Sequence, residues 1–245
     1  MSFFCNFRAQ KKRMRLFLKI FLLFTVGIVF SQDINDENAA TLKIDSLYRE
    51  DQFYFGFTYN SLQNKPSGLL QTRFSKGFSV GFLRDMPVNK RRTLAVATGI
   101  GVSYMGYNQN LFISETNQIP SYTFVESDIS IKKNKFTQFL IDVPLELRWR
   151  SSTFESHKFW RIYGGLKSSY LVNNRSIYVA NQTKITVANN PDFQKLNYGV
   201  YLATGYNAIN VYGYYGLNTL FQSQKMDTTL QDMTSLNIGI IFYIL

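Results

Sequence analysis

Cysteine and histidine are almost absent from this sequence of 245 residues, which has one of each. Cys5 lies upstream of an expected cleavage site, so we expect the mature chain to have no thiol, disulfide or thiolate metal site. His157 lies in an expected short turn, which argues against a Ser/His/Asp triad at the rim of the folded domain. We therefore expect no catalytic residues, no metal and no cofactor, and a fold that is stabilised without disulfides.

Runs of one charge sign are also rare, although the full sequence has a formal net charge of +11. Six of its 27 basic residues and none of its 16 acidic residues fall within residues 1–31, so removing that segment leaves a net charge of +5. The longest basic run in the remainder is Lys90-Arg91-Arg92. Because a nucleic-acid-binding surface needs clustered cations, we expect no nucleic-acid partner.

Apolar runs long enough for a transmembrane helix are missing. The longest, Leu16–Phe30, spans 15 residues with few interruptions, whereas a spanning helix needs roughly twenty. It follows a basic segment without acidic residues, as in a secretory signal peptide. We predict a signal peptide over residues 1–31, with cleavage after Ser31; a membrane anchor is the alternative, and translation starts at Met1 or at Met14.

Aromatic residues are, by contrast, abundant, with 22 Phe and 16 Tyr. After a polar, acidic segment over residues 32–51, which we assign to the periplasm, residues 52–245 alternate between strand-like runs and polar connections. Within most runs every second residue is apolar, and the others are small, polar or charged. The eight runs are Phe53–Asn60, Phe74–Arg84, Thr93–Tyr107, Phe136–Arg150, Lys158–Leu171, Lys195–Tyr206, Ile209–Phe221 and Leu236–Leu245.

The connections between these runs alternate in length. Those after the second, fourth and sixth runs are short, and the others are longer, which is typical of an outer-membrane barrel with short periplasmic turns and longer extracellular loops. A soluble β-sandwich has similar strand spacing, but it does not need aromatic residues at strand ends, as at Tyr104, Trp149, Trp160 and Tyr170. We predict an all-β fold, an eight-stranded antiparallel up-and-down transmembrane β-barrel over residues 52–245.

The two faces of the predicted strands differ in size and charge. Eight strands enclose too little space for the bulky apolar face, so we expect that face to contact lipid and the small and charged residues to fill the lumen. Asp142, Glu146, Arg148, Arg161 and Lys167 then lie together inside. We predict that they form an ion network that closes the bore, rather than an acid–base pair for catalysis or an open pore.

The last run is an alternating apolar strand that reaches the final residue. In a soluble protein it would form an aggregation-prone edge, whereas in a closed barrel it pairs with the first strand. Asn237, Gly239, Phe242 and Ile244 fit the polar-x-Gly-x-x-aromatic-x-apolar pattern of outer-membrane insertion signals, and Leu245 follows. We therefore expect the barrel-insertion machinery to be a partner during assembly.

Several segments resemble strands of the PorT family of outer-membrane β-barrel proteins of the Bacteroidota. Phe139–Arg148 is similar to a proline-containing strand of that family, and Tyr163–Lys167, Tyr214–Asn218 and Ser235–Tyr243 are similar to later strands. The resemblance implies a non-enzymatic protein of a Gram-negative outer membrane, and the best-known member of the family supports type IX secretion and gliding. A proline within a strand also suggests a bulge at Pro144.

Two interpretations of function stay open at this point. In the first, the protein is an accessory barrel that contacts components of type IX secretion. In the second, it is a small porin-like transport or surface ligand-binding barrel, which uses its lumen or the long loops Asn108–Lys135 and Val172–Gln194. Outer-membrane lipid surrounds the barrel in both.

Overall fold

The computed structural model describes residues 51–71, 73–89, 91–117, 119–125, 131–151, 160–180, 183–222, 230 and 232–244. The predicted signal peptide, residues 1–31, and residues 32–50 of the predicted periplasmic segment lie outside these residues. Within the described residues, no helix is long and apolar enough to cross a membrane.

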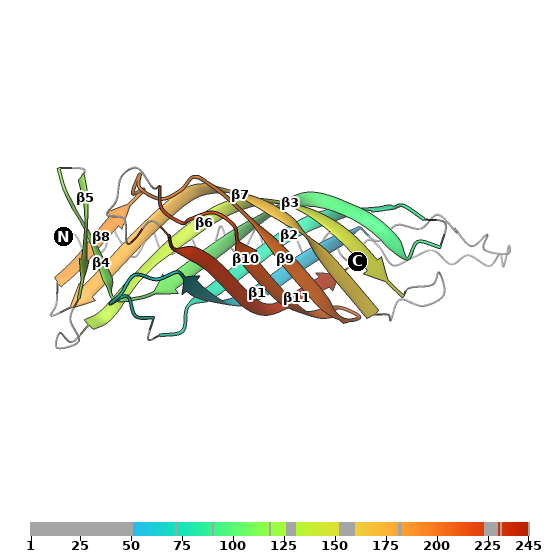
Figure 1. The fold of residues 1–245 in the computed structure, drawn as a ribbon, viewed down its shortest axis with the longest axis horizontal. Helices are drawn as coiled ribbons and strands as arrows, with labels where there is room; N and C mark the ends of the chain where they lie inside the picture. The colour runs from blue at the N-terminus through green and yellow to red at the C-terminus, as the bar shows by residue number, and fades with distance from the viewer. Residues whose placement is uncertain are drawn as a thin grey trace, which may run out of the picture. The chain divides into compact units, whose positions relative to one another are not determined.

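Eight strands form the wall of a closed antiparallel barrel within the described residues (Figure 1). They are β1 (Gln52–Gln63), β2 (Lys76–Pro87), β3 (Leu94–Asn108), β6 (Ile131–Arg150), β7 (Trp160–Ala180), β9 (Leu196–Tyr206), β10 (Ile209–Gly216) and β11 (Thr234–Ile244). Around the wall the order is β6, β3, β2, β1, β11, β10, β9 and β7, and the pairing of β6 with β7 closes the ring.

Three further described strands lie at the end of the barrel where the connections are long, which we call the long-loop end. The strands β4 (Leu111–Thr116) and β5 (Ile119–Phe124) form a separate hairpin. The strand β8 (Thr183–Ala188) pairs with the part of β7 that extends beyond the wall. Figure 1 shows all three gathered beside the tips of β6 and β7. The opposite end, with the short connections, is the short-turn end.

The predicted fold class is confirmed, but two predicted loops are wrong in part. Asn108–Lys135 contains the β4–β5 hairpin and the start of β6, and Val172–Gln194 contains the end of β7 and all of β8. These strands lie beyond the apolar band of the wall, so they carry no long alternating apolar face that would reveal them. The predicted run Ile209–Phe221 is also too long, because β10 ends at Gly216.

Apolar side chains cover the outside of the wall, because alternate residues of each strand face outward. Leu147 is 69% exposed, Val211 62% and Ile100 61%, although each lies within a strand of the wall. A soluble protein rarely leaves so large a contiguous apolar surface in water. This face is suited to lipid, as predicted from the sequence.

The predicted bulge at Pro144 is wrong. Pro144 pairs with Lys167 of β7 in the regular register, and the register of this ladder shifts between Phe139 and Leu140, so the extra residue lies on β7. In the ladder with β3 the pairing passes from Leu145 directly to Asp142. The missing backbone donor of proline is therefore accommodated by two skipped pairs, not by an inserted residue.

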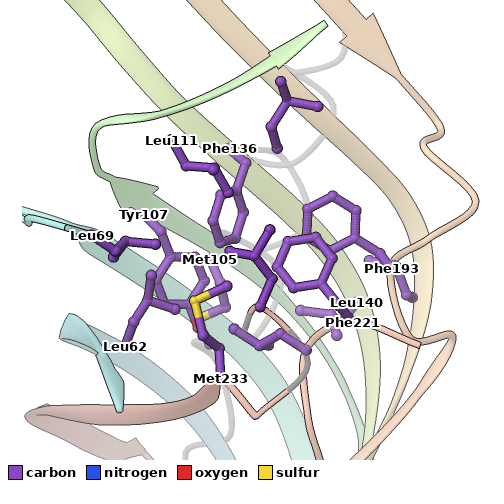
Figure 2. Close-up of a cluster of buried hydrophobic side chains, with 14 residues drawn as sticks. Leu62, Leu69, Met105, Tyr107, Leu111, Phe136, Leu140, Phe193, Phe221 and Met233 are labelled. Carbon is purple, nitrogen blue, oxygen red and sulfur yellow. The ribbon is translucent and has the colours of Figure 1, made fainter. Parts of the chain in front are cut away.

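Inward-facing side chains fill the barrel in two regions of different chemistry. Towards the short-turn end the interior is rich in tyrosine, with Tyr54, Tyr163, Tyr201, Tyr212, Tyr214 and Tyr243 buried in one cluster. At the long-loop end, residues of the wall and of the loops form an apolar plug (Figure 2). Its buried members are Leu62, Leu69, Met105, Tyr107, Leu111, Ile113, Phe136, Leu140, Leu171, Phe193, Leu220, Phe221, Leu230 and Met233.

Tyrosine rings therefore share the lumen with the small and charged residues that were expected there. Glycines on neighbouring strands make room for the tyrosine rings: the nearest ring carbons of Tyr54 lie 2.6 Å from where a Cβ would stand at Gly81, and those of Tyr214 lie 2.6 Å from that position at Gly199. At Gly101 a Cβ would overlap the Tyr54 hydroxyl. The small residues predicted to face inward are the sites over which these rings lie.

Candidate functional site

A buried carboxylate joins two arginines at the short-turn end of the lumen. Asp85 on β2 accepts hydrogen bonds from Nη1 of Arg148 at 3.0 Å and from Nη2 of Arg150 at 2.9 Å, and none of the three side chains is exposed. Arg150 also donates from Nε to the carbonyl of Arg92 at 2.8 Å. The carboxylate of Asp51 accepts a hydrogen bond from the backbone N–H of Asp85. These contacts bind β1, β2 and β6 together.

Glu146 continues this arrangement towards the middle of the barrel. Its Oε2 accepts from Nε of Arg148 at 2.7 Å, and its Oε1 accepts from the hydroxyl of Tyr201 at 2.8 Å and from that of Tyr243 at 3.4 Å. The Arg148 guanidinium lies 4.7 Å from the centre of the Tyr163 ring, a distance at which cation–π attraction is effective. A buried cation and a buried anion are therefore both supported by tyrosine.

A second buried pair lies one layer further in. The ammonium of Lys167 is 3.9 Å from Oδ2 of Asp142, and Ser169 donates to the other oxygen at 2.6 Å. The same ammonium lies 3.3 Å from the Tyr212 hydroxyl and 4.4 Å from the centre of the Tyr214 ring. Because the Lys167 and Asp142 side chains are only 9% and 1% exposed, desolvation makes each contact important to the folded state.

All five residues of the predicted ion network are buried in the lumen, with Asp142, Glu146, Arg148, Arg161 and Lys167 each 7% exposed or less. The structure brings Glu146 to Arg148 and Asp142 to Lys167. Arg161 is paired with Arg150 in the β6–β7 ladder, so it lies at the short-turn end.

Sequence reasoning missed Asp85 and Arg150 as members of the network. Asp85 was assigned to a turn after a run ending at Arg84, but β2 continues to Pro87. Alternation along the strand from the inward-facing Leu83 would have placed Asp85 inside.

The spaces left inside the lumen are small. One cavity of about 20 Å³ is lined by polar residues including Ser103, Gln138 and Asn237, and another of about 20 Å³ lies beside Tyr54 and Glu146. Each has room for about one or two water molecules. Between these cavities and the long-loop end stands the apolar plug, in which Phe193 and Phe221 stack with ring centres 4.4 Å apart.

The β4–β5 hairpin is fixed to the rest of the long-loop end by specific contacts. The hydroxyl of Tyr122 donates to Asp192 at 2.8 Å and accepts from the side-chain amide of Asn190 at 2.8 Å. The ring of Phe112 lies 4.5 Å from that of Tyr178 on β7. Burial raises the pKa of the Tyr122 phenol well above its usual value, and the Asp192 carboxylate raises it further. The phenol is therefore neutral and able to donate.

The residues of the predicted insertion signal lie on β11, which pairs with β1 along its length. Phe242 pairs with Phe55 and Ile244 with Phe53, and Ile244 is half-exposed on the outer face. Asn237 is buried and pairs with Asn60. A Cβ at Gly239 would overlap the carbonyl of Phe57 on β1, so only glycine permits this close approach of the two strands.

In structure the chain is similar to Ail, the attachment invasion locus protein of Yersinia pestis, with 12% sequence identity. The similarity covers 81% of this chain and 100% of the Ail chain. The TM-score is 0.38 for Ail in complex with the heparin analogue sucrose octasulfate and 0.36 for Ail alone. No curated protein matches the sequence. Residues 30–222 match a family described as "Outer membrane protein beta-barrel domain". Since that match covers most of the chain, the protein belongs to this family of outer-membrane β-barrels.

Proposed function

We propose that this protein is a non-enzymatic, non-conducting outer-membrane barrel that works through the surface of its long-loop end. The observation that carries the proposal is the filled lumen: buried ion pairs occupy one half of it, and the apolar plug occupies the other. In barrels of the outer membrane the short turns face the periplasm and the long loops face outward. The long-loop end is then the extracellular surface.

The folded state of the long-loop end supports this proposal. The β4–β5 hairpin and the β7–β8 extension are held by ring contacts and by the Tyr122, Asn190 and Asp192 hydrogen bonds. A surface that is ordered before it meets a partner loses less conformational entropy on binding. Such a surface suits a contact role better than transport, because ion pairs and packed rings of the described residues fill the lumen.

A planar-bilayer recording of the purified, refolded protein tests the closed barrel. We expect no stable conductance steps, because ion pairs and packed rings fill the bore. The matched variant is Asp85→Ala, which removes the buried carboxylate between Arg148 and Arg150. Stable, large steps from the wild-type protein would contradict the proposal. Steps from the variant alone would support it, since they would identify the ion pairs as the barrier.

We propose further that the extracellular or periplasmic contacts of the barrel serve type IX secretion. The support is the sequence resemblance to the PorT family, which is strongest after Phe136 and most specific in the proline-containing segment of β6. Deleting the gene and assaying surface delivery of secreted proteins tests this role. Loss of delivery, restored by the wild-type gene, is the expected result. Unchanged delivery would remove the secretion role and leave a surface ligand-binding barrel as the better proposal.

A further inference from the structure

The extension of β6, β7 and β8 beyond the barrel wall carries a group of cations on its outward face. Val179 on β7 pairs with Lys133 on β6 and, on its other side, with Lys184 on β8. Ile177 on β7 pairs with Lys135 on β6. Directly opposite partners in neighbouring strands share one face of the sheet. Arg175 lies two residues from Ile177 on β7 and so faces the same way. We define the basic face as Lys133, Lys135, Arg175 and Lys184 around Ile177 and Val179.

The opposite face of the same extension is covered by protein. Asn134, Phe136 and Ser176, which alternate with residues of the basic face, are buried, and Tyr178 contacts the ring of Phe112. Lys133, Arg175 and Lys184, in contrast, are exposed. The two sides of this small sheet therefore differ: the inner one is packed against the hairpin, and the outer one presents charge.

Nothing within these strands neutralises the cations. No aspartate or glutamate occurs in residues 131–138, 171–180 or 183–188. A fifth cation joins the edge of the face, because Arg73 donates from Nη2 to the carbonyl of Ile131 at 2.9 Å and from Nη1 to that of Lys132. Of the carboxylates described at this end, Asp192 accepts from Tyr122, and Glu115 lies on the β4–β5 hairpin. Within the described strands of the extension, the basic face therefore carries positive charge only.

The height of the basic face above the apolar wall is informative. Phe139 and its partner Tyr104 form the last outward aromatic pair on β6 and β3. Counted along β6 from Phe139 towards the long-loop end, Thr137, which pairs with Arg175, is two residues away. Lys135 is four residues away and Lys133 six. With a rise of about 3.4 Å per residue and a tilt of about 40°, the cations lie roughly 5 to 15 Å above the aromatic pair. That layer holds the headgroups of a membrane, not its hydrocarbon.

We propose that the basic face binds the phosphate groups of the phosphorylated glycolipid, a lipopolysaccharide, that forms the outer leaflet around the barrel. Charge complementarity supports this partner, and so does the position of the face, which continues the lipid-facing wall into the headgroup layer. Arg175 can bind a phosphate through two parallel N–H groups, and the lysines act as point charges around it. The proposal rests on the outward orientation of the long-loop end given above.

The test measures binding of fluorescent lipopolysaccharide to the full-length protein refolded in neutral detergent micelles. The variant Lys133→Gln, Arg175→Gln, Lys184→Gln removes three exposed cations of the face. Lys65→Gln, Arg84→Gln, Arg91→Gln is the matched control, since it removes three exposed cations elsewhere. A cation near an anionic surface strengthens attraction about fivefold, so we expect the face variant to bind about 100-fold more weakly and the control less than fivefold.

A second arm uses lipopolysaccharide from which the phosphates have been removed. We expect wild-type protein to bind it about as weakly as the face variant binds the intact glycolipid. Equal losses in the two variants, or binding that survives removal of the phosphates, would overturn the proposal. Retained heat-modifiable migration in electrophoresis verifies that each variant is folded. Neither arm measures secretion or conductance. Loss of the expected binding difference would therefore not contradict the proposed function, and a conducting or secretion-independent barrel would not contradict the binding result.

Discussion

The short-turn half of the lumen and the long-loop half are both filled, but by different means. In the short-turn half, inward side chains of the wall form ion pairs such as Asp85 with Arg148 and Arg150. In the long-loop half, loop residues such as Phe193 and Phe221 fold inward and complete an apolar core. The first half is closed by electrostatics among strands, and the second by a small hydrophobic core that the loops supply.

This difference indicates where the barrel tolerates change. A buried ion pair loses stability sharply when one partner is removed, because the other charge stays behind without compensation. An apolar core loses stability in proportion to the volume that is removed and to how well the site can collapse. We therefore expect a large loss of stability when a single charged residue of the short-turn half is replaced. In the long-loop half we expect a loss that increases with the apolar volume that is removed.

The largest expected effect comes from removing residues 242–245. This truncation deletes Tyr243, which contacts Glu146 and Tyr163 in the lumen, together with the pairing of Phe242 and Ile244 to β1. Without closure of the ring, the ionic half loses its wall. We expect no folded barrel in the outer-membrane fraction, measured by heat-modifiable migration. A matched truncation of Leu245 alone should assemble, and a folded product from the longer truncation would show that closure is dispensable.

Asp85→Ala is expected to have the next largest effect. Both arginines that donate to this carboxylate are fully buried, so the substitution removes a carboxylate that two buried cations share, while Arg148 keeps its contact with Glu146. Loss of one partner from a buried pair costs about 3–5 kcal/mol in the free energy of unfolding. Urea titration of the protein in lipid vesicles measures this. The exposed carboxylate Glu115 supplies the control Glu115→Gln, and a loss below about 1 kcal/mol at Asp85 would mean that the arginines find other partners.

Phe136→Ala tests the apolar half with a change of comparable size. Phe136 is fully buried in the plug, where its ring lies 4.9 Å from that of Tyr107 and 5.2 Å from that of Phe193. Truncating a buried phenylalanine costs about 3–5 kcal/mol, and partial collapse of the loops should place this site near the lower limit. Unlike Asp85→Ala, this substitution changes no charged group, so the loss should follow the volume that is removed, and Phe136→Leu should lose less than Phe136→Ala. Equal losses in these two variants would remove the distinction between the halves.

The sequence predicted much of the ionic half and little of the apolar half, for a physical reason. Alternation along a strand assigns a side chain to one face from local pattern alone, which is how Asp142, Glu146 and Lys167 were placed inside. Asp85 is missing from the predicted network only because the predicted run ends at Arg84, whereas β2 continues to Pro87. Phe193 and Phe221 lie outside the regular strands, so their inward packing depends on the tertiary fold of the loops and has no periodic signal.

Gly101→Ala probes the fit between tyrosines and glycines in the tyrosine-rich region of the lumen. A Cβ at this position would overlap the hydroxyl of Tyr54 and would stand 2.8 Å from the carbonyl of Val80. Overpacking of this kind costs about 1–3 kcal/mol. The second substitution Tyr54→Phe removes the clashing hydroxyl, so it should restore part of the loss in the same urea titration. If the losses in the free energy of unfolding from the two substitutions simply added, the Tyr54 ring would not lie over Gly101 in solution.

Tyr122→Phe should have the smallest effect, and a local one. The substitution removes a hydroxyl that donates to Asp192 and accepts from Asn190 but leaves the ring, which contacts Phe221 with centres 6.0 Å apart. One hydrogen bond to a charged acceptor is worth about 1.5–3 kcal/mol at most, and exposure of the site lowers this to about 1 kcal/mol. Hydrogen exchange should therefore speed up in β4 and β5 while amides of β1 and β11 keep their protection. If the wall exchanged faster as well, the loops would be part of the cooperative unit of the barrel, and the two halves of the lumen would not be separable.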